Sequence, residues 1–239
     1  MNMKIVKLTI DGKEVSAQEG DTILNAAREN SIDIPTMCDL EGLSSLGGCR
    51  LCIVEVKGSS RPFPSCTTPV SNGMEVVTNS EKLAKYRRML VELFLSERTH
   101  ICSVCIANGS CELQEMATKL GVDHVRFTRE WTGYEVDSSH ELFVLDPNRC
   151  VLCTRCIRVC DEIEGVHTLD LMSRGKDSQV IIDLNEPWSS SSSCTSCGKC
   201  SAVCPVGAIY IKGKPLTEVK KKGLPEFINE RRLWKRDET

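Results

Sequence analysis

Cysteine is the residue type whose number and spacing could carry chemistry in this chain. The sequence has 239 residues and 15 cysteines. Two stretches repeat the spacing CxxCxxCxxxC: CVLCTRCIRVC, from Cys150 to Cys160, and CTSCGKCSAVC, from Cys194 to Cys204. A CxxCxxC stretch folds as a short loop that turns three thiolates toward one face of an iron–sulfur cubane, whereas a cysteine one helical turn further along points away. The two runs therefore predict one interlocked unit with two metal sites.

These runs resemble those of bacterial ferredoxins with two [4Fe–4S] clusters, in which the fourth cysteine of each run ligates the other cluster. Pro205 follows the second run as in that pattern, whereas Asp161 follows the first. The resemblance implies one [4Fe–4S] cluster on Cys150, Cys153, Cys156 and Cys204, and another on Cys160, Cys194, Cys197 and Cys200. Two zinc knuckles are the alternative, but zinc takes two pairs of ligands, which leaves the third cysteine of each CxxCxxC without a role.

A different spacing, Cx10CxxCx13C, joins the four N-terminal cysteines, which are Cys38, Cys49, Cys52 and Cys66. Gly47 and Gly48 precede the second of them and allow the backbone to wrap closely around a buried inorganic core. The long first gap resembles the [2Fe–2S] domain at the front of the large iron–sulfur subunit of respiratory complex I and of iron-only hydrogenases. That resemblance implies a [2Fe–2S] cluster on these four cysteines, with a four-cysteine zinc site as the alternative.

A further set is one ligand short of the four that a [4Fe–4S] cluster takes, because it contains only Cys102, Cys105 and Cys111. Complex I and iron-only hydrogenases share HxxxCxxCxxxxxC at this place, followed by a Glu/Asp-Leu-Gln helix. Here Glu112-Leu113-Gln114 matches, but the histidine, His100, stands two residues before the first cysteine, and Arg98 occupies the usual place. Arginine stays protonated and cannot ligate. We expect His100 to complete the set, with solvent as the alternative; we expect the other histidines to be structural or surface residues, namely His124, His140 and His167.

The elements that would position these ligands predict an α+β fold. Residues 3–10 and 13–17 form a hairpin pattern, a helix capped by Asp21 or Thr22 covers 23–30, and strands at 52–56 and 74–78 would complete a small β-grasp sheet. Ser80 opens the next helix, and its basic residues are expected to face outward: Lys82, Lys85, Arg87 and Arg88. Further on, we expect a connector at 121–149 containing Trp131, a strand pair at 167–172 and 179–183, a solvated serine loop at 189–193 and a last strand at 206–213.

We therefore divide the chain into four segments. A β-grasp [2Fe–2S] domain covers residues 1–78, a helical domain with the histidine–cysteine cluster and a connector covers 79–145, a two-cluster ferredoxin-like domain covers 146–212, and a charged tail covers 213–239. The tail could line a partner subunit or only its own surface.

Composition excludes several other classes of function. A net charge of −3 and 5% aromatic residues offer neither a basic field nor a stacking surface for nucleic acid. No apolar run reaches the ~20 residues of a membrane span, and no secretory signal opens the sequence, so we expect a cytoplasmic location. Neither GxGxxG nor a P-loop is present, so no nucleotide or flavin site is predicted.

The order of these motifs resembles the U subunit of Hox-type bidirectional, NAD-reducing nickel–iron hydrogenases, which is their diaphorase iron–sulfur subunit. The resemblance implies one [2Fe–2S] cluster, three [4Fe–4S] clusters and a role in electron transfer. It also implies as partners a flavin- and NAD(H)-binding diaphorase subunit and the hydrogenase small and large subunits. We expect length to separate this chain from complex I and iron-only hydrogenase chains, which continue into a large further domain. The alternatives are a similar subunit of a formate dehydrogenase, an NADP-reducing hydrogenase or a complex I-like enzyme, and a zinc-organised interaction scaffold.

Overall fold

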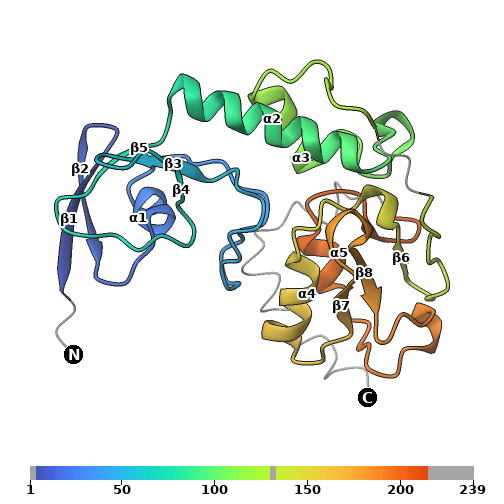
Figure 1. Ribbon diagram of the computed structural model, residues 1–239. Coiled ribbons are helices and arrows are strands. Elements are labelled where there is room, and N and C mark those ends of the chain that lie inside the picture. Colours follow the sequence, from blue (N-terminus) through green and yellow to red (C-terminus); the bar gives the residue numbers. More distant parts are fainter. Residues whose placement is uncertain (1–3, 130–132, 215–239) are drawn as a thin grey trace.

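The computed structural model of the protein describes residues 4–129 and 133–214. Figure 1 shows an N-terminal sheet module and a C-terminal module at opposite ends, with two helices, α2 (Glu81–Glu97) and α3 (Glu112–Lys119), lying across the top. The loop that joins the first helix to the third strand extends from the N-terminal module toward the C-terminal one. Trp131 and the tail from residue 215 lie outside the described residues, so the predictions for them are not tested.

The N-terminal module is the predicted β-grasp sheet. Its strands are β1 (Ile5–Ile10), β2 (Lys13–Gln18), β3 (Ile53–Val56), β4 (Phe63–Pro64) and β5 (Glu75–Val77). They lie in the order β2-β1-β5-β3-β4, and only the β1–β5 pair is parallel among these. Helix α1 (Ile23–Glu29) begins where the Thr22 hydroxyl accepts a hydrogen bond from Asn25 N at 3.2 Å. Its buried face packs with the alternate residues of β1, as the period-2 pattern of that strand predicts.

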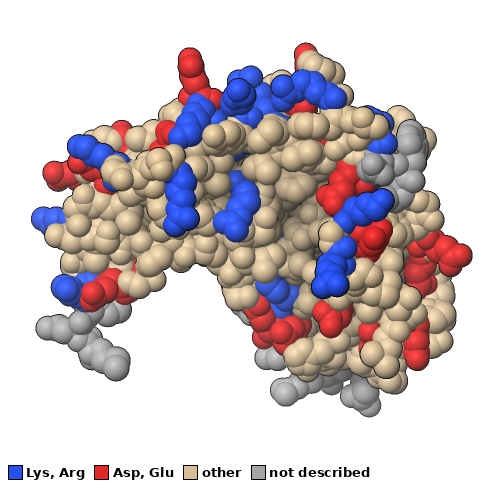
Figure 2. Space-filling model, viewed as in Figure 1, with Lys and Arg blue, Asp and Glu red and all other residues tan. Residues whose placement is uncertain are grey.

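Helix α2 begins at its predicted cap, because the Ser80 hydroxyl accepts from Leu83 N at 3.2 Å. Figure 2 shows basic side chains gathered over this helix, and Lys82, Lys85 and Arg88 are exposed as predicted. The prediction for Arg87 was wrong, since its side chain is only 4% exposed. Its guanidinium donates to the carbonyls of Leu51 at 3.0 Å and Ile53 at 2.7 Å. An arginine that satisfies two buried carbonyls can lie in a core position.

Replacing Arg87 with methionine should destabilise the N-terminal module by about 2–4 kcal/mol, because two buried carbonyls would lose their donor. Those carbonyls flank Cys52, so the loss would loosen the backbone around that cysteine. Urea denaturation followed by circular dichroism measures the effect. The exposed neighbour on the same helix gives the control, and Arg88→Met should change stability by less than about 0.5 kcal/mol. Equal effects of the two substitutions would contradict this assignment.

The C-terminal module contains two small antiparallel sheets. The predicted strand pair is present as β7 (Leu169–Met172) and β8 (Gln179–Ile182). The predicted last strand is β9 (Ile209–Ile211), and it pairs with β6 (Phe143–Leu145), a strand within the expected connector that the sequence did not indicate. Short helical segments carry the cysteine runs: α4 (Arg155–Arg158), the π-helical turn η3 (Val159–Glu164) and α5 (Lys199–Val203).

Ion pairs with one buried partner join the helices to the rest of the structure. Glu92 of α2 is 5% exposed, and both of its carboxylate oxygens accept hydrogen bonds from Arg126. The Nε atom of Arg126 lies 2.8 Å from Glu92 Oε2. Glu112 at the start of α3 pairs with Arg155 of α4 at 2.9 Å. Within the described ranges, no helix has both the length and the apolar character needed to cross a bilayer.

Candidate metal centres

The N-terminal cysteines form two close pairs, and each cysteine is at most 8% exposed. Cys38 and Cys49 lie in the loop between α1 and β3, Cys52 directly precedes β3, and Cys66 follows β4. Cys49 N lies 3.5 Å from Cys38 Sγ, and the sulfurs of Cys52 and Cys66 are 3.4 Å apart. Hydrogen bonds from their neighbours lower the pKa of Cys38 to about 5 and that of Cys52 to about 7. The same hydrogen bonds raise the pKa of Cys49 and of Cys66. One cysteine of each pair is therefore favoured as a thiolate, the form that binds iron, next to a thiol.

Gly47 shapes the loop that carries Cys38 and Cys49. It has a φ of +67°, and a Cβ at its position would lie 3.1 Å from Thr67 Cγ2. Any other residue would be strained by the backbone conformation and crowded by that neighbour. The close wrapping expected from the Gly47-Gly48 pair is therefore present at Gly47.

The structure brings His100, Cys102, Cys105 and Cys111 to the lining of one cavity. The Nε2 atom of His100 is buried and has no hydrogen-bond partner, and burial lowers the pKa of this histidine to about 4. An imidazole kept neutral, with an unpaired nitrogen next to three thiols, fits a metal ligand. Gly207 lines the same cavity, and a Cβ there would lie 2.8 Å from Cys105 Sγ. The residues present therefore fit a cluster with one histidine and three cysteine ligands.

Replacing His100 with alanine should change the EPR signal of one [4Fe–4S] cluster and leave the others unchanged, because only one cavity contains this ring. His100→Cys should keep the cluster and lower its reduction potential, because a thiolate adds negative charge to the ligand set. EPR-monitored redox titration measures both effects. The control is His124→Ala, which changes a side chain that is 72% exposed. Unchanged spectra in His100→Ala would remove His100 from the proposed ligands.

Arg98, at the usual histidine place of the related motif, does not line this cavity. Its guanidinium donates instead to the carbonyl of Ser178 in the C-terminal module. The shift of the histidine along the sequence is therefore matched by the structure, which directs position 100 and not position 98 into the cavity. Arg98→His combined with His100→Ala should consequently not restore the signal lost in His100→Ala.

The first ferredoxin-like set is assembled from both runs. Burial raises the pKa of the Cys156 thiol well above its usual value, and the negative charges of its neighbours raise it further. The largest of these contributions come from Cys153, Cys150 and Cys204. A buried group of mutually repelling thiolates is stable only when a cation shares the site. Cys204 thus lies with the three cysteines of the other run, as the interlocked arrangement requires.

The second ferredoxin-like set also combines cysteines of both runs. One cavity is lined by Cys160 of the first run together with Cys194, Cys197 and Cys200. Burial and the other three thiols raise the pKa of Cys200 well above its usual value. The indole N–H of Trp188 donates to Cys194 Sγ at 3.3 Å. Hydrogen bonds of this kind to cluster sulfurs influence the reduction potential.

The two runs have the same backbone conformation. Leu152 and Ser196 have φ values of 51° and 56°, and Thr154 and Gly198 have φ values of 58° and 73°. In both runs the backbone N–H two residues after the first cysteine donates to the sulfur of that cysteine. Leu152 N lies 3.3 Å from Cys150 Sγ, and Ser196 N lies 3.4 Å from Cys194 Sγ. A threonine in the left-handed region is uncommon, so the first run keeps this loop at a conformational cost. Repetition of the loop supports equivalent roles for the two runs.

Serine residues before Cys194 contribute more than the predicted solvated loop. The Ser193 hydroxyl lies 2.8 Å from Thr168 Oγ1 and 2.6 Å from Asp183 Oδ1, and Ser191 Oγ accepts from Cys194 N at 3.2 Å. Both serines are half-buried. The loop is therefore held against β7 and β8, and it positions the first cysteine of the second run.

The set with His100 and the set with Cys160 each line a cavity and do not converge on a single point. In the part of the chain that the structure describes, no three His, Cys, Asp or Glu side chains lie close enough together to hold one metal ion.

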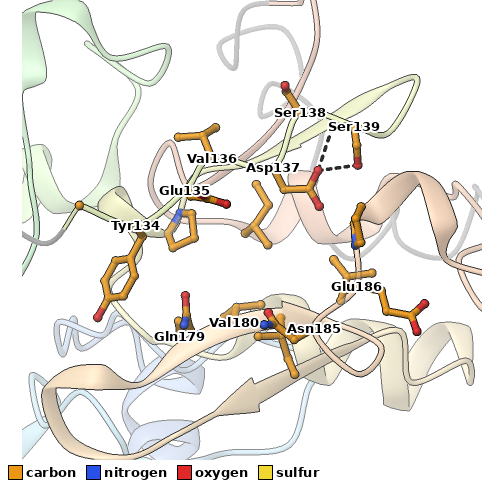
Figure 3. A pocket seen from close by; sticks show the side chains of 16 residues that line it. Tyr134, Glu135, Val136, Asp137, Ser138, Ser139, Gln179, Val180, Asn185 and Glu186 are labelled. Atoms are coloured by element: carbon orange, nitrogen blue, oxygen red, sulfur yellow. Dashed lines mark hydrogen bonds between the residues drawn. The ribbon is translucent and has the colours of Figure 1, made fainter.

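A different cavity, of about 650 Å³, lies between residues 133–139 and β8 and contains no cysteine among its lining residues. Figure 3 shows Tyr134 and Asp137 on one side of it and Gln179 and Asn185 on the other. The Asp137 carboxylate accepts hydrogen bonds there from the Ser139 hydroxyl and from the Trp188 backbone N–H, the latter at 2.7 Å.

Sequence reasoning did not predict the buried cations beside the cysteines. Arg155, Arg158 and Lys199 are at most 8% exposed, although each lies within a cysteine run. Arg158 donates to the carbonyls of Cys38 and Ser44 in the N-terminal module and to that of Cys153 at 3.1 Å. Lys199 pairs with Glu164. The signal that could have found them is a basic residue next to a ligand, where negative charge must be offset.

Three family descriptions match successive parts of the chain. The 2Fe-2S iron-sulfur cluster binding domain matches residues 3–81. The NADH-ubiquinone oxidoreductase-G iron-sulfur binding region matches residues 87–126, and the ferredoxin-like domain of NADH-quinone oxidoreductase subunit 3 matches residues 141–210. The fold class predicted from the sequence, with three domains of these types in this order, is therefore confirmed.

Curated relatives are similar to this chain over most of its length. The NADP-reducing hydrogenase subunit HndD of Solidesulfovibrio fructosivorans is 39% identical over 213 residues, covering 87% of this chain and 36% of the relative. The NADPH-Fe(3+) oxidoreductase subunit alpha of Geobacter sulfurreducens is 38% identical over 208 residues, covering 87% and 24%. The NADH-ubiquinone oxidoreductase 75 kDa subunit of Reclinomonas americana is 35% identical over 208 residues, covering 87% and 30%. The chain thus spans about a quarter to a third of the length of these relatives.

A solved structure matches over a larger share of both chains. A chain in the crystal structure of an NAD+-reducing [NiFe]-hydrogenase in the H2-reduced state has 32% identity and a TM-score of 0.81, and the match covers 89% of each chain. The three matched family descriptions give the order of the domains, and the hydrogenase chain shares the overall arrangement of this chain. The chain therefore belongs to the family of iron–sulfur subunits built on the three-domain N-terminal module that NADH-quinone oxidoreductases share with NAD(P)-reducing hydrogenases.

Proposed function

We propose that this chain is the electron-transfer subunit that relays electrons between a flavin- and NAD(H)-binding subunit and a nickel–iron hydrogenase module. The observation that carries the proposal is the match to a chain of an NAD+-reducing [NiFe]-hydrogenase over 89% of both chains. The diaphorase subunit and the hydrogenase small and large subunits are the proposed partners. An NADP-reducing hydrogenase is the second candidate, because subunit HndD of such an enzyme is 39% identical.

The proposed cofactors are one [2Fe–2S] cluster and three [4Fe–4S] clusters. Clusters of these types accept and release one electron at a time, which divides a two-electron hydride transfer on a distant flavin into single steps. The cysteines and His100 would bind them, and the burial of nine of the fifteen cysteines would keep water away from those sulfurs. Buried Arg155, Arg158 and Lys199 would offset the negative charge of the thiolate sets. Arg158 would also hold the [2Fe–2S] loop against the first ferredoxin-like run.

Metal and sulfide content tests the cofactor part of this proposal. Anaerobically purified protein should contain about 14 irons per chain with a matching amount of acid-labile sulfide. A colourless protein with zinc and no labile sulfide would instead identify a zinc-organised scaffold. The partner part is tested separately by affinity purification from the native host and mass spectrometry. Copurification of a flavoprotein with hydrogenase subunits supports the proposal, whereas a formate dehydrogenase or quinone-reducing enzyme would contradict it.

A further inference from the structure

Trp188 places a buried hydrogen-bond donor against one of the proposed cluster ligands. It is 2% exposed and lines the cavity of the second ferredoxin-like set together with the four cysteines of that set. Its indole Nε1 lies 3.3 Å from Cys194 Sγ. Because an indole nitrogen donates and never accepts, the N–H must point at the sulfur. One ligand of this set therefore receives a hydrogen bond from a side chain that water does not reach.

The equivalent sulfur of the first run lacks such a donor. Cys150 and Cys194 each accept a hydrogen bond from the backbone N–H two residues further along, at 3.3 Å and 3.4 Å. Within the described residues, no side chain donates to Cys150 Sγ. The two runs have the same loop conformation, so this donor is not part of the repeated loop. It comes from a separate segment and acts on one of the two sulfurs.

Three contacts hold the indole in this position. Trp188 begins the short 3-10 turn η5 (Trp188–Ser190), and its backbone N–H donates to Asp137 Oδ2 at 2.7 Å. The ring of Phe143 in β6 stacks on the indole, with centroids 5.3 Å apart and an interplanar angle of 27°. The ring of His140 lies with its centroid 5.2 Å from that of the indole. The N–H is therefore fixed in direction before any charge appears on the sulfur.

We propose that Trp188 raises the reduction potential of the [4Fe–4S] cluster that the second ferredoxin-like set would hold. This inference rests on the function proposed above. Reduction of such a cluster adds one electron, and part of the added negative charge lies on the sulfurs. The positive end of the N–H dipole stabilises that charge, so the reduced form gains more from the hydrogen bond than the oxidised form does. Burial of the indole keeps this interaction from being screened by water.

EPR-monitored redox titration of the anaerobically purified full chain tests this role. Trp188→Phe keeps an aromatic ring in the cavity and removes the N–H. At a fixed solution potential, the ratio of reduced to oxidised cluster should fall by roughly threefold to tenfold, which is what one hydrogen bond contributes. Only the signal that Cys160→Ser removes should shift. The matched control is Tyr134→Phe, which removes a hydroxyl that donates to the Lys176 carbonyl at 3.2 Å and should shift no potential.

A second variant preserves the shape of the side chain. Incorporation of 3-benzothienylalanine at position 188 replaces the indole N–H with a sulfur atom and keeps both fused rings. The stack with Phe143 and His140 should therefore remain, and so should the iron content. We expect this variant to lower the same potential as Trp188→Phe does, because both lack the donor.

Each outcome decides the question. An unchanged or higher potential in the benzothienyl variant with full iron content would overturn the proposal, and so would an equal fall in the potentials of all clusters. If Trp188→Phe loses iron and the benzothienyl variant retains it, the potential of the latter decides. If both lose iron, the indole is required for cluster assembly and the proposed effect on the potential is wrong. The iron and sulfide content of the unmodified chain tests the proposed function independently of these results.

Discussion

Replacing Cys204 with serine is expected to remove the [4Fe–4S] cluster proposed for the first run while leaving the cluster of the second run in place. The reason is the exchange of ligands between runs, since Cys204 lies with Cys150, Cys153 and Cys156. Iron content should fall from about 14 to about 10 atoms per chain. Iron analysis with EPR of the reduced protein measures the loss and identifies the cluster concerned.

The reciprocal variant provides the matched control. Cys160→Ser should remove a similar amount of iron but abolish the other signal, because Cys160 lines the cavity of Cys194, Cys197 and Cys200. If each substitution instead removed the cluster of its own run, the interlocked assignment would be wrong. Loss of all clusters in both variants would indicate that the module folds only when fully loaded, and partial reconstitution with limiting iron would then be used to compare the order of filling.

Replacing Arg158 with glutamine is expected to separate the [2Fe–2S] loop from the ferredoxin-like module. Arg158 reaches the carbonyls of Cys38, Ser44 and Cys153, so two buried acceptors and one partly buried acceptor would lose a charged donor. The local opening free energy of residues 38–46 should fall by about 3 kcal/mol. That change corresponds to a loss of protection of roughly a hundredfold in amide hydrogen exchange. Magnetic coupling between neighbouring reduced clusters should weaken in the same variant.

Arg174→Gln is the control for this substitution, because Arg174 is exposed in the turn between β7 and β8. Amide hydrogen exchange of residues 38–46 in the Arg174→Gln variant should equal that in the unmodified chain. Arg158→Lys tests the geometry, since one ammonium group cannot reach three carbonyls as a planar guanidinium does. Unchanged protection in Arg158→Gln would show that other contacts hold the loop and would contradict the proposed junction.

Local signals accounted for much of the fold. The hairpin of β1 and β2, the caps at Thr22 and Ser80 and the pair β7–β8 each depend on residues close together in the sequence. Such signals operate through short-range hydrogen bonds and side-chain periodicity, so they can be read without knowledge of the rest of the molecule. Strand β6 has only three residues, too few to show a periodic pattern. It forms because it pairs with β9, which lies more than sixty residues away in the sequence.

The number and spacing of the cysteines restrict which metal groups they can hold, and the motif order resembles that of one family. The kind of chemistry could therefore be predicted before the fold was known. The positions of the charged side chains around those cysteines, in contrast, depend on how distant segments pack together. Arg87, Arg98 and Arg158 look like surface residues in the sequence, yet each is buried by a contact with a distant segment. Burial of a cation depends on what lies opposite it in space, and no local pattern records that.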